Sequence, residues 1–268
     1  MKKMALVMLV LVLPAASRLY AQSESVRTLY TRENRFPELG KFEVGGLVSY
    51  QQLDEYFINQ IDSKCFKGYN VPKDAKRSET TITPYARYGL YENLTMYGRV
   101  PIDAVSSDVK GTSSGLKDIA VVWELLAYEY TYRYPWIVPY VEVTFPTGDS
   151  KNYTGCGKVD PIFGVAVGTV TFDQYHWILD GRYDANVVND GRFEGAASFI
   201  WDISDQFSVL AEAKVTQKPK GSTKDVPVYF NGGFAYKPTD SLSVNLYGGT
   251  SLNAEENGHG AVKVAYNF

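Results

Sequence analysis

Apolar and polar residues alternate along most of the chain after residue 40, in segments of roughly ten residues. One segment near the C-terminus shows the pattern clearly. Its first face carries Phe207, Val209, Ala211, Ala213 and Val215, and its second face carries Ser208, Glu212, Lys214 and Thr216. A period of two residues is typical of a β-strand that lies between an apolar and a polar environment. No helical period with capping residues extends over a comparable length.

The same pattern predicts about twelve strands along the chain. They are expected at 41–54, 78–89, 94–104, 117–131, 135–146, 160–172, 175–187, 192–202, 206–216, 226–237, 241–251 and 260–268. Short polar turns alternate with mostly longer connections, expected at 55–77, 105–116, 147–159, 188–191, 217–225 and 252–259. We therefore predict an all-β fold, an antiparallel up-and-down transmembrane β-barrel of the outer-membrane type over residues 41–268, with its short turns in the periplasm.

Aromatic residues gather near the predicted short turns, where amphipathic rings favour the membrane interface. They are Tyr88, Tyr91, Tyr132, Trp136, Phe172, Tyr175, Trp177, Trp201, Phe207 and Tyr236. The last strand ends at Phe268, which resembles the C-terminal signal read by the outer-membrane assembly machinery, although Lys263 stands where that signal usually has glycine. Expected partners are this machinery and outer-membrane lipid. A secreted soluble β-sandwich is the alternative.

The residues before the first strand differ from the rest of the chain. Lys2 and Lys3 precede an apolar run, and Ala21 precedes Gln22, which predicts a cleaved signal peptide over 1–21 and export to the outer membrane. Loss of the three cations Lys2, Lys3 and Arg18 changes the formal net charge from −3 to −6. Without a basic excess, no nucleic-acid partner is expected. Residues 22–40 show little alternation and either enter the lumen as a partial plug or remain in the periplasm.

The polar strand faces predict a lumen of mixed charge. Its candidate lining residues are Arg87, Arg99, Asp118, Glu124, Glu142, Asp180, Arg182, Asp184, Glu212 and Lys214. Two interpretations remain open, a polar constriction that passes a small solute and an ion-pair plug that only fills a closed barrel. The mixture of signs argues against a pore lined for acidic oligosaccharides. A non-conducting barrel for adhesion or envelope structure is the alternative function.

The rarer residue types give weaker indications. Cys65 and Cys156 lie in two long connections on the same predicted side, so they are either a disulfide formed during export or two free thiols. His176 is expected inside, just above a periplasmic turn, and His259 in a loop. Neither position suits a lipid-facing Ser–His site. We predict no catalytic residues, no metal site and no cofactor.

Three short motifs resemble a known family. They are Gly115–Ile119 (Gly-Leu-Lys-Asp-Ile), Phe145–Asp149 (Phe-Pro-Thr-Gly-Asp) and Gly155–Gly157 (Gly-Cys-Gly). The chain from about residue 40 onward resembles the outer-membrane proteins described as "putative MetA-pathway of phenol degradation". The resemblance implies a barrel that transports small organic compounds, aromatic ones among them. Pro146, Gly148 and Asp149 suit a turn, and Asp118 suits an acceptor for loop amides or a lumenal arginine, so structural roles are expected for both motifs.

Overall fold

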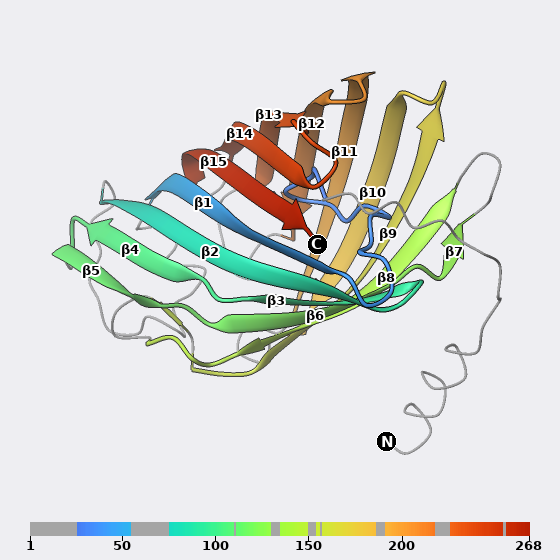
Figure 1. The fold of residues 1–268 in the computed structure, drawn as a ribbon. Helices are drawn as coiled ribbons and strands as arrows, with labels where there is room; N and C mark the ends of the chain where they lie inside the picture. Colours follow the sequence, from blue (N-terminus) through green and yellow to red (C-terminus); the bar gives the residue numbers. More distant parts are fainter. Residues whose placement is uncertain are drawn as a thin grey trace.

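The computed structural model describes residues 26–54, 75–109, 111–129, 135–149, 154–155, 157–185, 191–217, 226–253 and 256–268. Their regular elements are strands of one closed antiparallel sheet (Figure 1). The strands are β1 (Phe42–Asp54), β2 (Lys76–Tyr91), β3 (Leu94–Arg99), β4 (Ile102–Ser107), β5 (Gly111–Leu116), β6 (Ile119–Leu125), β7 (Tyr128–Glu129), β8 (Trp136–Phe145), β9 (Asp160–Thr171), β10 (Tyr175–Asp184), β11 (Arg192–Ser204), β12 (Phe207–Thr216), β13 (Val228–Tyr236), β14 (Leu242–Leu252) and β15 (Glu256–Asn267). Within these ranges, no helix is long and apolar enough to cross a membrane.

These elements form the wall of a twelve-stranded barrel. The strand β2 pairs with β3 and then with β4, and β8 pairs with β6 and then with β7. Consequently β3 with β4, and β5 with β6 and β7, each act as one long interrupted strand. The barrel closes because β1 pairs with β15 on one side and β2 on the other. The predicted fold class and strand number are therefore confirmed.

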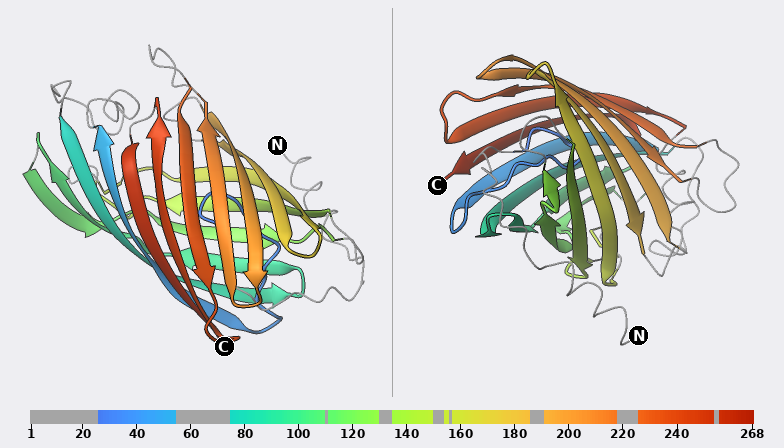
Figure 2. Two further views of the ribbon diagram at one scale, coloured as in Figure 1. Left: turned by 90° about the horizontal axis from the view of Figure 1, so that it is seen from above. Right: turned by 90° about the vertical axis from the view of Figure 1, so that its right-hand side faces the viewer.

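The connections lie at two distinct ends of the barrel (Figure 2). We call them the short-turn end, which holds the C-terminus, and the long-loop end. At the C-terminus, the Phe268 amide donates a hydrogen bond of 2.8 Å to the Phe42 carbonyl. Both ends of the barrel sequence are thereby fixed at the same rim.

The side chains follow the predicted alternation with one clear exception. Phe172, Trp177 and Trp201 are exposed on the outer wall near the short-turn end, as expected for an aromatic girdle. The assignment of Trp136 to this girdle is wrong. Its side chain faces the interior and is buried, with its ring beside Gly168 of β9. Tyr132 lies outside the described residues.

Four of the predicted element ranges are also wrong. Residues 105–116 are not a loop, because β4 and β5 form a hairpin with Ile102 opposite Leu116. The expected strands at 94–104 and 117–131 are each interrupted, the first beside Pro101, which has no amide hydrogen for the ladder. The Pro101 carbonyl still accepts a hydrogen bond of 2.8 Å from the Lys117 amide, so the break between β3 and β4 lies beside the break between β5 and β6. The connection expected at 252–259 is shorter than expected, since β15 begins at Glu256.

Candidate functional site

Residues 26–40 run inside the barrel, as the blue segment before β1 in Figure 1 shows. Thr28, Thr31 and Phe36 are buried there. At the short-turn end the Gly40 amide donates to the Gly89 carbonyl of β2 at 2.9 Å. A Cβ added to Gly89 would lie 2.2 Å from the Glu38 carbonyl oxygen, so the close approach of segment and wall requires glycine.

The segment is folded around one of its own carboxylates. The Glu33 side chain accepts hydrogen bonds from the backbone amides of Arg27 at 2.5 Å and Thr28 at 3.1 Å. It also accepts from Arg35 Nε at 2.9 Å. Because Glu33 is buried, these charge-assisted bonds replace the water that it would otherwise bind. The segment therefore enters the lumen as a compact turn.

Glu212 of β12 binds the backbone of this turn. Its carboxylate accepts from the amides of Leu29 and Tyr30, both at 3.0 Å. It also accepts from Ser198 Oγ at 2.8 Å and from Asn231 Nδ2 at 2.6 Å, on the neighbouring strands. A buried carboxylate is costly unless hydrogen bonds satisfy it, and Glu212 has four such donors.

Arg32 of the segment connects three wall strands. Its guanidinium lies 3.3 Å from a Glu124 oxygen on β6 and 3.2 Å from a Glu142 oxygen on β8, and its amide donates to Asp180 of β10 at 3.1 Å. Burial lowers the pKa of Arg32, but the carboxylates of Glu124 and Glu142 outweigh burial, and the net effect raises it. Arg32 therefore carries its charge in the lumen.

Side chains of the wall also bind carbonyl groups of the segment. Lys263 Nζ donates to the Val26 carbonyl at 2.7 Å, and the Tyr247 hydroxyl donates to the Arg27 carbonyl at 2.6 Å. Farther along, Arg87 donates to the Arg35 carbonyl at 2.5 Å. These donors lie on β15, β14 and β2, and together with the contacts to β6, β8, β10 and β12 they hold the segment from nearly all sides of the lumen.

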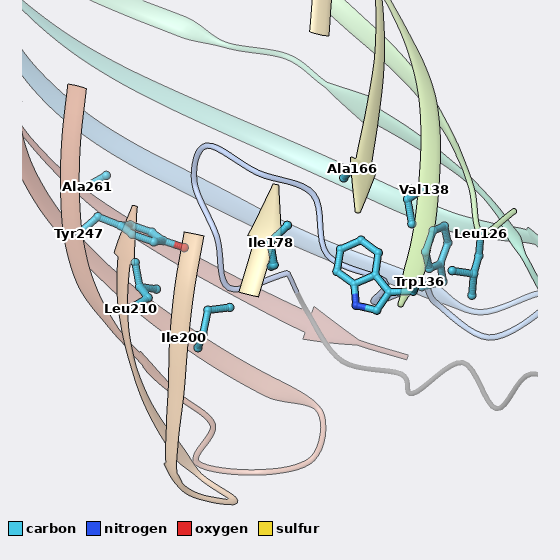
Figure 3. Close-up of a cluster of buried hydrophobic side chains, with 10 residues drawn as sticks. Leu126, Trp136, Val138, Ala166, Ile178, Ile200, Leu210, Tyr247 and Ala261 are labelled. Atoms are coloured by element: carbon cyan, nitrogen blue, oxygen red, sulfur yellow. The ribbon is translucent and has the colours of Figure 1, made fainter. Parts of the chain in front are cut away.

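An apolar cluster in the lumen complements these polar contacts (Figure 3). It contains Phe36, Leu126, Trp136, Val138, Ala166, Ile178, Ile200, Leu210, Tyr247 and Ala261. All but Phe36 belong to the wall, and Leu29 of the segment packs against them. Apolar side chains that remained in contact with water in an open pore would contribute no hydrophobic stabilisation. The segment provides the surface that covers them.

The structure brings together six of the ten predicted lumen residues around the segment. The six residues that contact its backbone or side chains are Arg87, Glu124, Glu142, Asp180, Glu212 and Lys214. The other four lie elsewhere. Arg99 pairs with Glu142, Arg182 Nε donates to Glu194 at 2.6 Å, Asp118 binds a connecting segment, and Asp184 ends β10 opposite Arg192.

Sequence reasoning missed the residues that organise this network. Arg27, Arg32 and Glu33 stand in a segment with no strand pattern, so alternation did not assign them to the lumen. A signal was available on the wall, because Ile178 and Leu210 are apolar residues on otherwise polar strand faces. Such residues indicate that something other than water covers that part of the lumen.

The two longer family motifs bind each other. Thr147 Oγ1 accepts from the Ile119 amide at 2.9 Å and donates to the Lys117 carbonyl at 2.9 Å. Asp118 accepts from the Gly148 amide at 2.8 Å. Gly148 must be glycine, since an added Cβ would lie 2.1 Å from the Thr154 carbonyl oxygen. The motifs therefore fix the chain that leaves β8 against the interruption between β5 and β6.

Two cavities flank the segment along the barrel axis. The cavity toward the long-loop end has a volume of about 690 Å³ and is bordered by Thr28–Arg32 of the segment and by wall residues such as Arg99, Lys117 and Arg182. The second, toward the short-turn end, has about 900 Å³ and is bordered by Arg27, Arg35 and Asp202. Residues of the segment contribute to the walls of both cavities.

The described residues hold no arrangement that suggests catalysis. Asp202 lies between Ser208 Oγ, at 2.6 Å, and His176 Nε2, also at 2.6 Å. In a Ser–His–Asp relay the histidine would stand in the middle. No group of three or more His, Cys, Asp or Glu side chains among the described residues could hold a metal ion. Cys65 and Cys156 lie outside this part of the chain.

The family model described as "Putative MetA-pathway of phenol degradation" matches residues 67–268. The chain belongs to this family. Among curated proteins, no sequence matches it. The match covers the wall from before β2 to the C-terminus and includes all three motifs. The resemblance drawn from those motifs is therefore confirmed, and the family membership agrees with the barrel fold.

Solved structures with similar folds are outer-membrane barrels. An outer membrane channel from Pseudomonas putida F1 is 15% identical with a TM-score of 0.69, and the match covers 91% of this chain and 100% of that one. The KdgM porin, in a complex with disordered oligogalacturonate, is 10% identical with a TM-score of 0.51, over 84% and 99%. The translocator domain of the autotransporter NalP from Neisseria meningitidis is 12% identical with a TM-score of 0.51, over 85% and 88%. At these identities the likeness shows the fold.

Proposed function

We propose that the protein is an outer-membrane channel for small organic solutes and that residues 26–40 close it in this conformation. One observation carries the proposal. A polar segment lies across the lumen of a closed barrel, with a cavity on each side. Passage would be passive and would need neither covalent chemistry nor a cofactor. The family description supports aromatic compounds among the solutes.

The orientation in the membrane is part of this proposal. The signal peptide over 1–21 would direct export, and the strand ending at Phe268 would be read by the assembly machinery. The short-turn end would face the periplasm, as short connections do in barrels of this type. The segment would then enter from the periplasm, and Cys65 and Cys156 would lie outside, where a disulfide between their loops remains a proposal.

The wall keeps its own ion pairs when the segment leaves. Glu124 retains Arg87 at 3.2 Å, and Glu142 retains Arg99. Neither of these two buried carboxylates is then left without a cation, which avoids the large cost of an unpaired buried charge. The segment can therefore be released from the Arg32 contacts without unfolding the barrel.

Planar-bilayer recordings of Arg32→Met test the proposal. The variant removes the ion pairs to Glu124 and Glu142 but keeps a side chain of similar length, so we expect the channel to be open in a larger fraction of the recording. Arg192→Met is the matched control, because Arg192 pairs with Glu194 within the wall at 3.0 Å. Background conductance in the wild type and in Arg32→Met would instead support a non-conducting structural or adhesion barrel.

A further inference from the structure

The cavity at the long-loop end presents more positive than negative charge to a solute. Arginine and lysine outnumber aspartate and glutamate among its described lining residues. Three of these cations, Arg99, Lys117 and Arg182, lie on or beside the wall strands and pair with carboxylates. Since each of these three cations is paired with a carboxylate, formal charge alone suggests that they add no net charge to the cavity. The relative exposure of the paired side chains shows which charge a solute in the cavity would meet.

In each pair the cation is accessible and the carboxylate is covered. The side chains of Arg99, Lys117 and Arg182 are 35%, 30% and 29% exposed. Their partners Glu142, Asp103 and Glu194 are 4%, 0% and 7% exposed. A solute in the cavity therefore meets ammonium and guanidinium groups first, with the carboxylates behind them. Because electrostatic energy falls with distance, the nearer charge dominates the local potential.

The opposite end does not share this uniform order. In the pair of Arg27 and Asp202, which borders the other cavity, the arginine is 8% exposed and the aspartate 25%. A second pair at this end, Arg35 with Glu33, is 14% and 3% exposed, so the order there is mixed. The three cations at the long-loop cavity, by contrast, are all far more exposed than their partners. A preference for anions would arise at the long-loop end.

The same cavity offers ring surfaces beside its cations. Tyr30 of the segment and Tyr97 of β3 border it and are only partly buried, and Leu47 of β1 adds an apolar patch. Guanidinium groups bind a carboxylate through two parallel hydrogen bonds, and ring faces accept flat organic groups. We propose that this cavity binds small aromatic monocarboxylates, of which benzoate is the simplest probe. As an account of what the channel passes, this inference rests on the proposed function.

Binding is measured with full-length protein in detergent, by calorimetric titration with benzoate and with benzyl alcohol. The two probes share a ring and differ in the carboxylate. We expect benzoate to bind more weakly as salt concentration rises, and benzyl alcohol to bind at least about tenfold more weakly than benzoate. Absence of benzoate binding, or equal affinity for both probes, overturns the inference.

Two matched variants locate the site. Arg182 and Arg192 both pair with Glu194, but of the two only Arg182 is among the described lining residues of the cavity. Arg182→Gln should weaken benzoate binding roughly tenfold, whereas Arg192→Gln should change it less than about twofold. Arg99→Gln is a second variant should Arg182→Gln fail to fold, since Glu142 keeps its pair with Arg32. If the cavity variant and Arg192→Gln lose benzoate affinity equally, the assignment of the binding site to this cavity is contradicted.

The titration does not depend on current through the channel. Benzoate binding that requires Arg182, together with a channel that never conducts, would count against the proposed function alone. Conductance without any preference for benzoate would count against this inference alone.

Discussion

Glycine residues make room for the inward aromatic rings of this barrel. The Trp136 ring lies over Gly168, and the Tyr140 ring lies over Gly164 on the same strand, β9. A Cβ added at Gly168 would be 2.1 Å from the indole ring, closer than any van der Waals contact. Because Trp136 belongs to the apolar cluster around Phe36, this single glycine influences how the segment packs.

Gly168→Ala is therefore expected to destabilise the barrel by about 1–3 kcal/mol through overpacking. Gly181→Ala is the control, since a Cβ there meets no atom within 4 Å. The measurement is the temperature at which the folded, fast-migrating gel band converts to the unfolded one. Equal transition temperatures for the two variants would show that Trp136 has room to move.

Asp118 shows how one carboxylate can fix a connection between strands. It accepts the Gly148 amide, and Gly155 packs close to the same carboxylate. Asp118→Asn replaces a charge-assisted bond with a neutral one and should speed amide hydrogen exchange near Gly148 by roughly tenfold. Asp108→Asn changes an equivalent bond, to the Lys76 amide, and should leave Gly148 unchanged. Equal exchange at Gly148 in both variants would contradict the role of Asp118.

At the scale of elements, the strands were predictable and the irregular pieces were not. Each wall strand carries its own signal, because lipid on one side and polar groups on the other impose a period of two. The hairpin of β4 and β5 was missed because Gly111–Gly115 is rich in glycine and serine and resembles a loop. Its pairing depends on its neighbours and not on its own composition.

The path of the segment could not be predicted from local pattern. Its contacts join residues far apart in the sequence, such as Arg32 with Glu142 and Arg27 with Asp202. In the sequence, neither the arginine nor the carboxylate identifies its partner. An inward carboxylate is equally compatible with an open, water-filled pore. Only the apolar residues on polar strand faces, such as Ile178 and Leu210, pointed to a covered lumen.

Phe36 connects the segment to that apolar surface, so its loss should favour the open state. Phe36→Ala should cost the closed conformation about 3 kcal/mol, because the side chain is completely buried. The ratio of open to closed time in single-channel records should rise more than about a hundredfold. Phe193→Ala is the control, as Phe193 is exposed on the outer wall. A ratio unchanged by Phe36→Ala would show that the cluster does not hold the segment.

At the scale of the whole molecule, the barrel and its contents have separate supports. The wall is held by a closed ladder of strands, and the segment by polar contacts and one apolar cluster. The ion pairs of Glu124 with Arg87 and of Glu142 with Arg99 join wall residues only and do not involve the segment. This separation is what a gate requires, because the occupant can move while the wall stays folded.

A reversible cross-link between segment and wall tests this central claim most directly. Thr31 Oγ1 and Ser198 Oγ lie 2.9 Å apart, so Thr31→Cys with Ser198→Cys places two thiols within bonding reach. We expect the oxidised variant to remain closed in planar bilayers and to conduct after reduction, whereas the wild type and Thr31→Cys alone respond equally little to reductant. An oxidised, cross-linked channel that conducts as well as the reduced one would contradict closure by residues 26–40.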